Sequence, residues 1–170
     1  SDLIAQHFGT DHRKIFVPSG ELMSALPGTI AAMSEPMVSY DNVGFYLLSK
    51  EVSKHIKVVQ SGQGADEVFG GYHWYPPLVE SNDVVRDYAK GFRDRAHDVL
   101  ARQIQSRWMA DRDVAGEFLA GELLRSGADT PVDAALRLDS NVMLVDDPVK
   151  RVDNMTMAWG LEAVSYTHLR

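Results

Sequence analysis

The chain lacks several features that would assign it to a particular class of protein. It has no cysteine, which excludes disulfides, thiolate–zinc sites and a cysteine nucleophile within these residues. Its formal net charge is -7, so we expect neither nucleic acid nor an anionic membrane as a partner. No apolar run approaches the roughly 20 residues that span a bilayer. No signal peptide opens the sequence, and the expected compartment is therefore the cytoplasm.

What the chain does contain is typical of a globular protein. Its 170 residues are enough for one domain with a real core. Hydrophobic residues make up 45% and charged residues 24%, which favours a folded chain over a disordered one. No internal repeat, low-complexity tract or linker divides the sequence, so we expect a single domain.

The most informative stretch is residues 61–72, which read Ser-Gly-Gln-Gly-Ala-Asp-Glu-Val-Phe-Gly-Gly-Tyr. A short β-branched run at 56–60 precedes it and predicts a buried strand. The first two glycines permit positive φ and let the backbone approach a ligand closely. Residues 65–69 predict the first turn of a helix, and the glycines at 70 and 71 are expected to end that helix. Its exposed N–H groups can hold a phosphate, and Asp66 and Glu67 can hold a divalent cation. The alternative is an ordinary strand–turn–helix corner whose acidic residues favour the helix dipole.

Taken together, these twelve residues resemble the S-G-x-G-x-D-E-x-F-G-G-Y motif of the asparagine synthase family. The synthetase domain of that family belongs to the ATP-pyrophosphatase (adenine nucleotide alpha hydrolase-like) group. The resemblance implies ATP and Mg²⁺ as cofactors and an ATP-dependent amide-forming ligase in amino-acid biosynthesis. It implies that Ser61, Gly62 and Gly64 contact the nucleotide or pyrophosphate, and that Asp66 or Glu67 binds magnesium or orients the loop.

Residues 146–163 resemble a second motif of the family, roughly D-R-M-S-M-A-x-x-L-E-x-R-x-P-F-L-D. By its pattern alone this segment predicts a buried helix face. Lys150 and Arg151 are either surface cations or partners of phosphates and of Asp66. We take Lys150, together with Gln63, Asp66 and Glu67 of the first motif, as the candidate catalytic residues. Asn154 departs from the motif, because the family commonly has arginine there.

The match has limits at both ends. Residues 164–170 resemble nothing in the family, and we interpret them as a non-native tail that arose from a sequencing or assembly artefact. The family's ATP loop, Ser-Gly-Gly-x-Asp-Ser, does not occur in the sequence. We therefore interpret residues 1–163 as a partial synthetase domain, inactive alone, from a larger amidotransferase. The missing glutaminase domain would supply ammonia, and the full-length protein is a candidate homodimer.

Gln63 helps to identify the acceptor, the small-molecule carboxylate that reacts with ammonia. Asparagine synthetases usually have glutamate at this place in the loop, and a neutral amide cannot act as a base or hold a cation equally well. Gln63, followed by the aromatic and proline residues at 73–77, looks more like the subfamily that amidates N-acetylglutaminylglutamine. Two other functions stay open: ATP-dependent ring closure of the β-lactam-synthetase kind, and a non-catalytic α/β nucleotide-binding module.

The expected fold is α/β, with part of a parallel-sheet ATP-pyrophosphatase core followed by a mainly helical segment from about 81 to 163. Strands are expected at 14–17 and 56–60. The two consecutive prolines within residues 73–78 predict a loop there. The aromatic residues of this loop either pack at the edge of the core or line the acceptor pocket. The other expected features are a helix end at Gly9, a helix capped by Ser19 and kinked or split at Pro27-Gly28, helices over 43–55 and 81–109, a cap at Asp113 and a strong helix start at 130–133.

Overall fold

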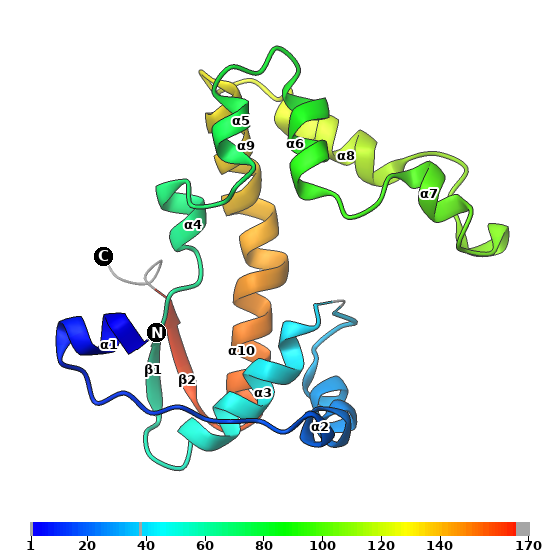
Figure 1. Ribbon diagram of the computed structural model, residues 1–170. Coiled ribbons are helices and arrows are strands. Elements are labelled where there is room, and N and C mark those ends of the chain that lie inside the picture. Colours follow the sequence, from blue (N-terminus) through cyan, green and yellow to red (C-terminus); the bar gives the residue numbers. More distant parts are fainter. Residues whose placement is uncertain (1, 38, 166–170) are drawn as a thin grey trace. The chain divides into compact units, whose positions relative to one another are not determined.

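The computed structural model describes residues 2–37 and 39–165 (Figure 1). Contacts within the chain divide it into two compact units. Unit 1 contains Ser1–Gln60 with Lys150–Val164, and unit 2 contains Ser61–Val149 with Ser165–Arg170. The described chain combines many helices with a small parallel sheet, which confirms the α/β fold class. None of the helices in the described residues is long and apolar enough to cross a membrane.

Unit 1 is organised around α3 (Asp41–Val52), on which two other helices pack. These helices are α2 (Ser19–Ala32) and α10 (Lys150–Met157). The first helix, α1 (Asp2–Phe8), ends at Gly9 as the sequence predicts. Gly9 has a φ of 62°, the left-handed conformation of a helix C-terminal cap.

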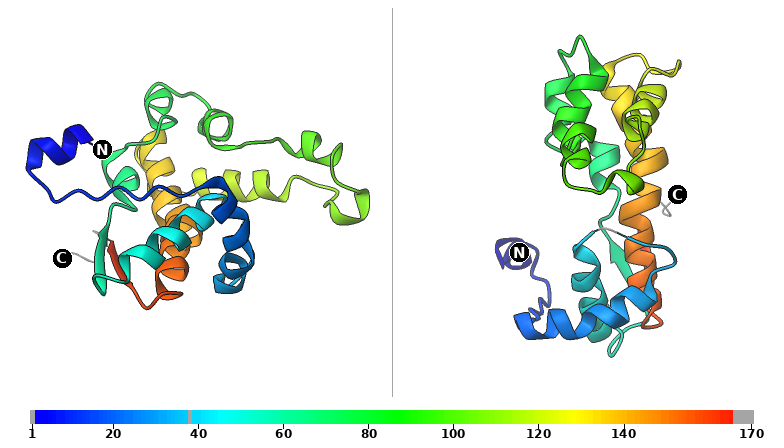
Figure 2. Two further views of the ribbon diagram at one scale, coloured as in Figure 1. Left: turned by 60° about the horizontal axis from the view of Figure 1, so that its bottom comes forward. Right: turned by 90° about the vertical axis from the view of Figure 1, so that its right-hand side faces the viewer.

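The sheet consists of β1 (Val58–Ser61) and β2 (Glu162–Ser165), which lie side by side in Figures 1 and 2. The Glu162 N–H donates to the Lys57 carbonyl across 2.9 Å, where the two strands begin to pair. The strand predicted at 56–60 is therefore confirmed, with its bounds moved along the chain, but its predicted burial is wrong, because its residues alternate between exposed and half-buried. The boundary between the two units falls at the last residue of each strand.

The strand β2 reaches into the segment that the sequence sets aside as a tail. Val164 and Ser165 continue this strand, and Ser165 is buried. The other residues of that segment, 166–170, lie outside the described residues. Excluding Val164 and Ser165 from the fold was therefore wrong, since pairing with β1 gives them an extended conformation.

The strand predicted at 14–17 is also wrong, because the backbone there is irregular. Ile15 and Phe16 are 43% and 89% exposed. A strand needs a neighbour to satisfy its backbone hydrogen bonds, and within the described residues no segment pairs with this one. The side-chain composition of residues 14–17 is therefore not enough to predict a strand.

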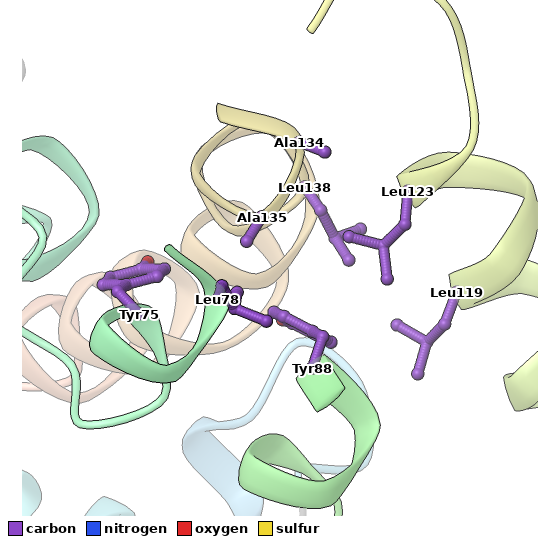
Figure 3. Packing of buried hydrophobic residues seen from close by; sticks show 8 residues of the cluster. All are labelled: Tyr75, Leu78, Tyr88, Leu119, Leu123, Ala134, Ala135 and Leu138. Carbon is purple, nitrogen blue, oxygen red and sulfur yellow. The ribbon is translucent and has the colours of Figure 1, made fainter. Parts of the chain in front are cut away.

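Unit 2 is helical and has its own core, in which eight side chains converge from α5, α6, α8 and α9 (Figure 3). The two tyrosines of this core, Tyr75 and Tyr88, are its largest side chains and are each at most 3% exposed. The elements of unit 2 are α4 (Ala65–Phe69), α5 (Tyr75–Leu78), α6 (Val84–Phe92), α7 (His97–Ala101), the 3₁₀ turn η1 (Ser106–Trp108), α8 (Val114–Leu123), α9 (Pro131–Leu138), and the π-helical segments η2 (Asp139–Met143) and η3 (Val145–Val149).

Two predicted helix starts in unit 2 are confirmed in detail. The Asp113 side chain accepts from the Gly116 N–H at the start of α8 (2.9 Å). At α9, Thr130 Oγ1 accepts from the Asp133 N–H, and Asp133 Oδ2 accepts from the Thr130 N–H, both at 3.1 Å. This reciprocal capping box satisfies two backbone donors that a helix start leaves without partners.

The capping box gives a stability prediction. Thr130→Ala should lower the free energy of unfolding by about 1 kcal/mol, because it removes the acceptor of the Asp133 N–H. Urea unfolding followed by circular dichroism measures the change. Thr10→Ala, at an exposed threonine outside the helices, is the control and should change stability much less. Equal losses in both variants would contradict the capping role.

Three helix predictions need correction. Pro27 lies inside an unbroken α2, and the N-cap of that helix is Pro18 rather than Ser19. The expected loop at 73–78 contains α5, because its two prolines fall in the first turn, where no intrahelical N–H is needed. The expected helix at 81–109 is broken after α6, where Arg93 has extended backbone.

Candidate functional site

The candidate site begins with a tight turn between β1 and α4. Ser61 ends the strand, and its Oγ accepts from the Gln63 N–H across 3.2 Å. The Gly62 carbonyl accepts from the Ala65 N–H, also at 3.2 Å, which closes the turn. Gly64 is buried and has a φ of 93°, a conformation that residues with a Cβ rarely adopt. The predicted change from strand to glycine loop to helix is confirmed.

The second glycine pair ends α4 and leaves room for Asp66. Gly70 has a φ of 67° and forms the C-terminal cap. The Gly71 N–H donates to the Asp66 carbonyl across 2.9 Å. A Cβ on Gly71 would lie 2.1 Å from Asp66 Oδ1, so the close approach of the Asp66 side chain requires glycine here.

The two acidic residues of α4 have different environments. Asp66 is exposed, whereas Glu67 is only 2% exposed. The Tyr72 hydroxyl donates to Glu67 Oε1 across 2.7 Å. Burial, together with the bond to Glu67, raises the pKa of Tyr72, so its hydroxyl stays protonated at neutral pH and can donate. Of the two carboxyl groups, only that of Asp66 is open to a solvent cation.

The segment that follows the glycine loop therefore offers a magnesium ion one exposed carboxylate, that of Asp66, rather than two. In the described part of the chain, no group of three or more histidine, aspartate or glutamate side chains is placed so that it could hold a metal ion. Mg²⁺ is usually held by one or two carboxylates together with substrate phosphates and water. The Asp66 side chain fits that pattern, whereas Glu67 is directed to Tyr72.

Gln63 is half-buried at the tip of the loop. Its backbone carbonyl accepts from the Ser165 hydroxyl across 2.6 Å. No local pattern indicates this contact, because residues 63 and 165 are 102 positions apart. The loop is thus fixed through its backbone at Gln63.

The aromatic segment after the loop packs at the edge of the unit 2 core. Tyr75 is 3% exposed and belongs to the core cluster. Trp74 Nε1 donates to Asp139 Oδ2 across 3.0 Å, and the Tyr75 hydroxyl donates to the same oxygen across 2.6 Å. Of the two roles that the sequence left open for these rings, the structure supports core packing.

Asp139 is the polar residue that the sequence analysis missed. Its side chain is fully buried and also accepts from the Tyr88 hydroxyl. Burial and the hydrogen bonds to Asp139 raise the pKa values of Tyr75 and Tyr88, which keeps both hydroxyls protonated as donors. An aspartate at the end of a helical pattern is usually exposed, so the sequence offered no local sign of this role.

The two cations of the second motif belong to unit 1. Lys150 Nζ donates to Glu35 Oε1. Arg151 is 8% exposed, and its Nη1 donates to Ser39 Oγ across 2.6 Å. Arg151 is therefore not a surface cation. The catalytic role of Lys150, and its pairing with phosphates, stay predictions.

Asn154, which departs from the family motif, has a structural role in unit 1. Its Oδ1 accepts from the Ser34 N–H across 2.8 Å, and its Nδ2 donates to the Lys150 carbonyl across 2.7 Å. The side chain thus ties the segment after α2 to α10. An amide can bond to both a backbone donor and a backbone acceptor in this way, whereas arginine only donates.

Comparison with known proteins gives a consistent result. A model of the asparagine synthase family matches residues 1–164. A putative glutamine-hydrolysing asparagine synthetase from Mycobacterium tuberculosis is 39% identical over 71 residues, which are 42% of this chain and 11% of that protein. Asparagine synthetase 1 of Bacillus subtilis is 39% identical over 62 residues, 36% of this chain and 10% of that protein. Asparagine synthetase B of Escherichia coli is 34% identical over 79 residues, 42% and 14% of the two chains. No solved structure matches.

The matched segment spans between 10% and 14% of the length of these three relatives. The family match, in contrast, covers nearly all of the 170 residues. It includes the glycine loop after β1, the two acidic residues of α4 and the second motif on α10. The chain belongs to the asparagine synthase family.

Proposed function

We propose that this chain is part of the synthetase domain of a glutamine-dependent amidotransferase that converts a carboxylate to an amide with ATP. The observation that carries the proposal is the loop at 61–64, where a buried Gly64 at positive φ brings the backbone into a tight turn beside an exposed Asp66. Membership of the asparagine synthase family supports it. The matched relatives carry names of glutamine-hydrolysing asparagine synthetases.

The proposed chemistry has two steps. A carboxylate oxygen of the acceptor attacks the α-phosphorus of ATP, and pyrophosphate leaves. Ammonia then attacks the carbonyl carbon of the acyl-adenylate, and AMP leaves with one oxygen of the original carboxylate. Adenylation is needed because hydroxide is a poor leaving group from an acid, whereas AMP is a good one. Ammonia would come from a glutaminase domain beyond these residues.

We assign the loop residues to this chemistry as follows. Ser61, Gly62 and Gly64 contact the nucleotide or pyrophosphate, because glycine backbone can approach phosphate oxygens closely. Asp66 is the proposed magnesium ligand, and Mg²⁺ would supply neutralisation of the pyrophosphate charge. Glu67 orients the loop through its bond to Tyr72. Lys150 is proposed as a cation for the phosphates.

The proposed acceptor is N-acetylglutaminylglutamine rather than aspartate. Gln63 supports this choice, because the acylated dipeptide has no free ammonium group for a glutamate to pair with, whereas the amide of Gln63 can both donate and accept hydrogen bonds. We further propose that the full-length protein acts in the cytoplasm and as a homodimer.

Pyrophosphate release tests the acceptor. The full-length protein that carries this chain is supplied with ATP, magnesium and ammonium, and with either aspartate or N-acetylglutaminylglutamine. Release with the dipeptide alone is the expected result. Release with aspartate alone would make the protein an asparagine synthetase and refute the dipeptide assignment. No release with either, from folded protein, would favour ring closure or a non-catalytic module instead.

A further inference from the structure

A series of direct contacts connects the core of unit 2 to α4. It starts at Asp139, which accepts from Trp74 Nε1 across 3.0 Å. The Trp74 ring stacks on the Tyr72 ring, with 4.2 Å between ring centroids and 16° between ring planes. The Tyr72 hydroxyl then donates to Glu67 Oε1 across 2.7 Å. Four side chains thus link the first residue of η2 to the helix that follows the glycine loop.

The core end of this series is firmly fixed. Asp139 is fully buried and accepts from Tyr75 and Tyr88 as well as from Trp74. Gly91 lets α6 approach Trp74, since a Cβ there would lie 2.6 Å from Trp74 Cβ. The indole ring is therefore held both by its hydrogen bond and by the backbone packed against it.

The loop end depends on a single hydrogen bond. Glu67 is 2% exposed, and within the described residues its Oε2 has no hydrogen-bond partner. Within the described residues, the Glu67 side chain is therefore fixed by the hydrogen bond that the Tyr72 hydroxyl donates to its Oε1. Glu67 lies on α4, whose first turn bonds back to the loop through the Ala65 and Val68 N–H groups. Movement of Glu67 would therefore move the loop at 61–64.

We propose that Asp139 is a positioning residue for this loop and that it acts through Trp74 and Tyr72 on Glu67. Asp139 sets the plane of the indole ring, the indole sets the plane of the Tyr72 ring by stacking, and the Tyr72 hydroxyl sets the position of Glu67. The consequence for catalysis depends on the proposed function, whereas the consequence for the order of the loop does not.

Hydrogen exchange of the full-length protein tests the positioning role without any ligand. Tyr72→Phe removes the hydroxyl and keeps the ring, and Trp74→Phe removes the indole N–H and keeps an aromatic ring. In either variant, exchange in a peptide covering 61–69 should become about tenfold faster, as expected when a hydrogen bond to a buried carboxyl group is lost or loosened. Exchange in α8 should stay unchanged.

The double variant separates this role from simple packing. If Trp74 acts through Tyr72, adding Trp74→Phe to Tyr72→Phe should produce no further increase in loop exchange. Matched controls are Trp108→Phe and Tyr40→Phe, at rings that are 73% and 89% exposed. Unchanged loop exchange in the single variants, or additive effects in the double variant, would overturn the proposal.

An activity measurement connects the loop to the reaction. The same variants should lower kcat for pyrophosphate release by about tenfold while the controls keep the wild-type value. Faster loop exchange with an unchanged kcat would overturn the catalytic half of the proposal. Wild-type protein that releases no pyrophosphate with any acceptor would refute the proposed function, and the exchange result would still decide the positioning role.

Discussion

Asp139→Ala should destabilise unit 2 more than any other single substitution considered for this chain. Asp139 is fully buried and accepts hydrogen bonds from Trp74, Tyr75 and Tyr88. Alanine would leave these donors without acceptors in the core, and each unsatisfied buried donor costs about 1 to 3 kcal/mol. We therefore expect a loss of at least about 3 kcal/mol, a large part of the stability of a typical domain.

Urea unfolding followed by circular dichroism measures this loss. Asp139→Asn keeps the shape and one carbonyl acceptor, so its loss should lie between those of the wild type and the alanine variant. Asp129→Ala, at an exposed aspartate in the loop before α9, is the matched control and should stay within about 0.5 kcal/mol of wild type. An alanine variant at position 139 that is as stable as this control would contradict the buried role of Asp139.

Arg151→Ala should cause the second large loss, in unit 1. The Arg151 side chain is 8% exposed, donates to Ser39 Oγ, and has its guanidinium carbon 5.6 Å from the centre of the Phe45 ring. One of its nitrogens lies 3.7 Å from an Asp41 carboxylate oxygen. Alanine removes the charge, the hydrogen bond and the packed aliphatic stem together. We expect a loss of roughly 2 to 3 kcal/mol, below the value for a fully buried ion pair because Asp41 is exposed and can be rehydrated.

Arg151→Lys separates the charge of this residue from its shape. Lysine keeps the charge but lacks the planar guanidinium that faces Phe45 and reaches Ser39, so we expect it to recover only part of the loss. Hydrogen exchange in α3 locates the effect, because Asp41 and Phe45 lie on that helix. Arg125→Ala, which removes an exposed arginine in unit 2, should leave exchange in α3 unchanged. Full recovery by lysine would show that charge alone matters.

Local features of the fold could be predicted from the sequence. The capping box of Thr130 with Asp133 and the left-handed cap at Gly9 depend on residues within one or two turns. The glycine loop after β1 is equally local, because Gly64 must adopt a positive φ before α4 can begin. In each case the physical constraint and the residues that meet it are neighbours in the chain.

Contacts between distant segments, which fix buried polar side chains within each unit, could not be predicted in the same way. Trp74 donates a hydrogen bond to Asp139, which is 65 positions away in the sequence. Arg151 donates one to Ser39, which is 112 positions away. A polar side chain shows no local sign of burial when its partners come from distant segments. The pattern at 81–109 failed for a related reason, because Arg93 ends α6 and pairs with Asp113 across 2.9 Å.

Proline is compatible with two of the helices in this chain. Proline disfavours a helix interior because it lacks an N–H and its ring crowds the preceding turn. In α5 the two prolines occupy the first turn, where no intrahelical N–H is required. In α2 the helix continues through Pro27 without a break. Position in the first turn accounts for the prolines of α5, whereas Pro27 shows that even an interior proline need not end a helix.

Transfer of oxygen from the acceptor to AMP tests the central claim most directly. The full-length protein is supplied with ATP, magnesium, ammonium and an acceptor whose carboxylate carries ¹⁸O, and the nucleotide and phosphate products are analysed by mass spectrometry. Attack of the carboxylate on the α-phosphorus predicts one ¹⁸O atom in each AMP released with the amide. Label in inorganic phosphate together with ADP would indicate an acyl phosphate instead, and would contradict the adenylation that we propose for this chain.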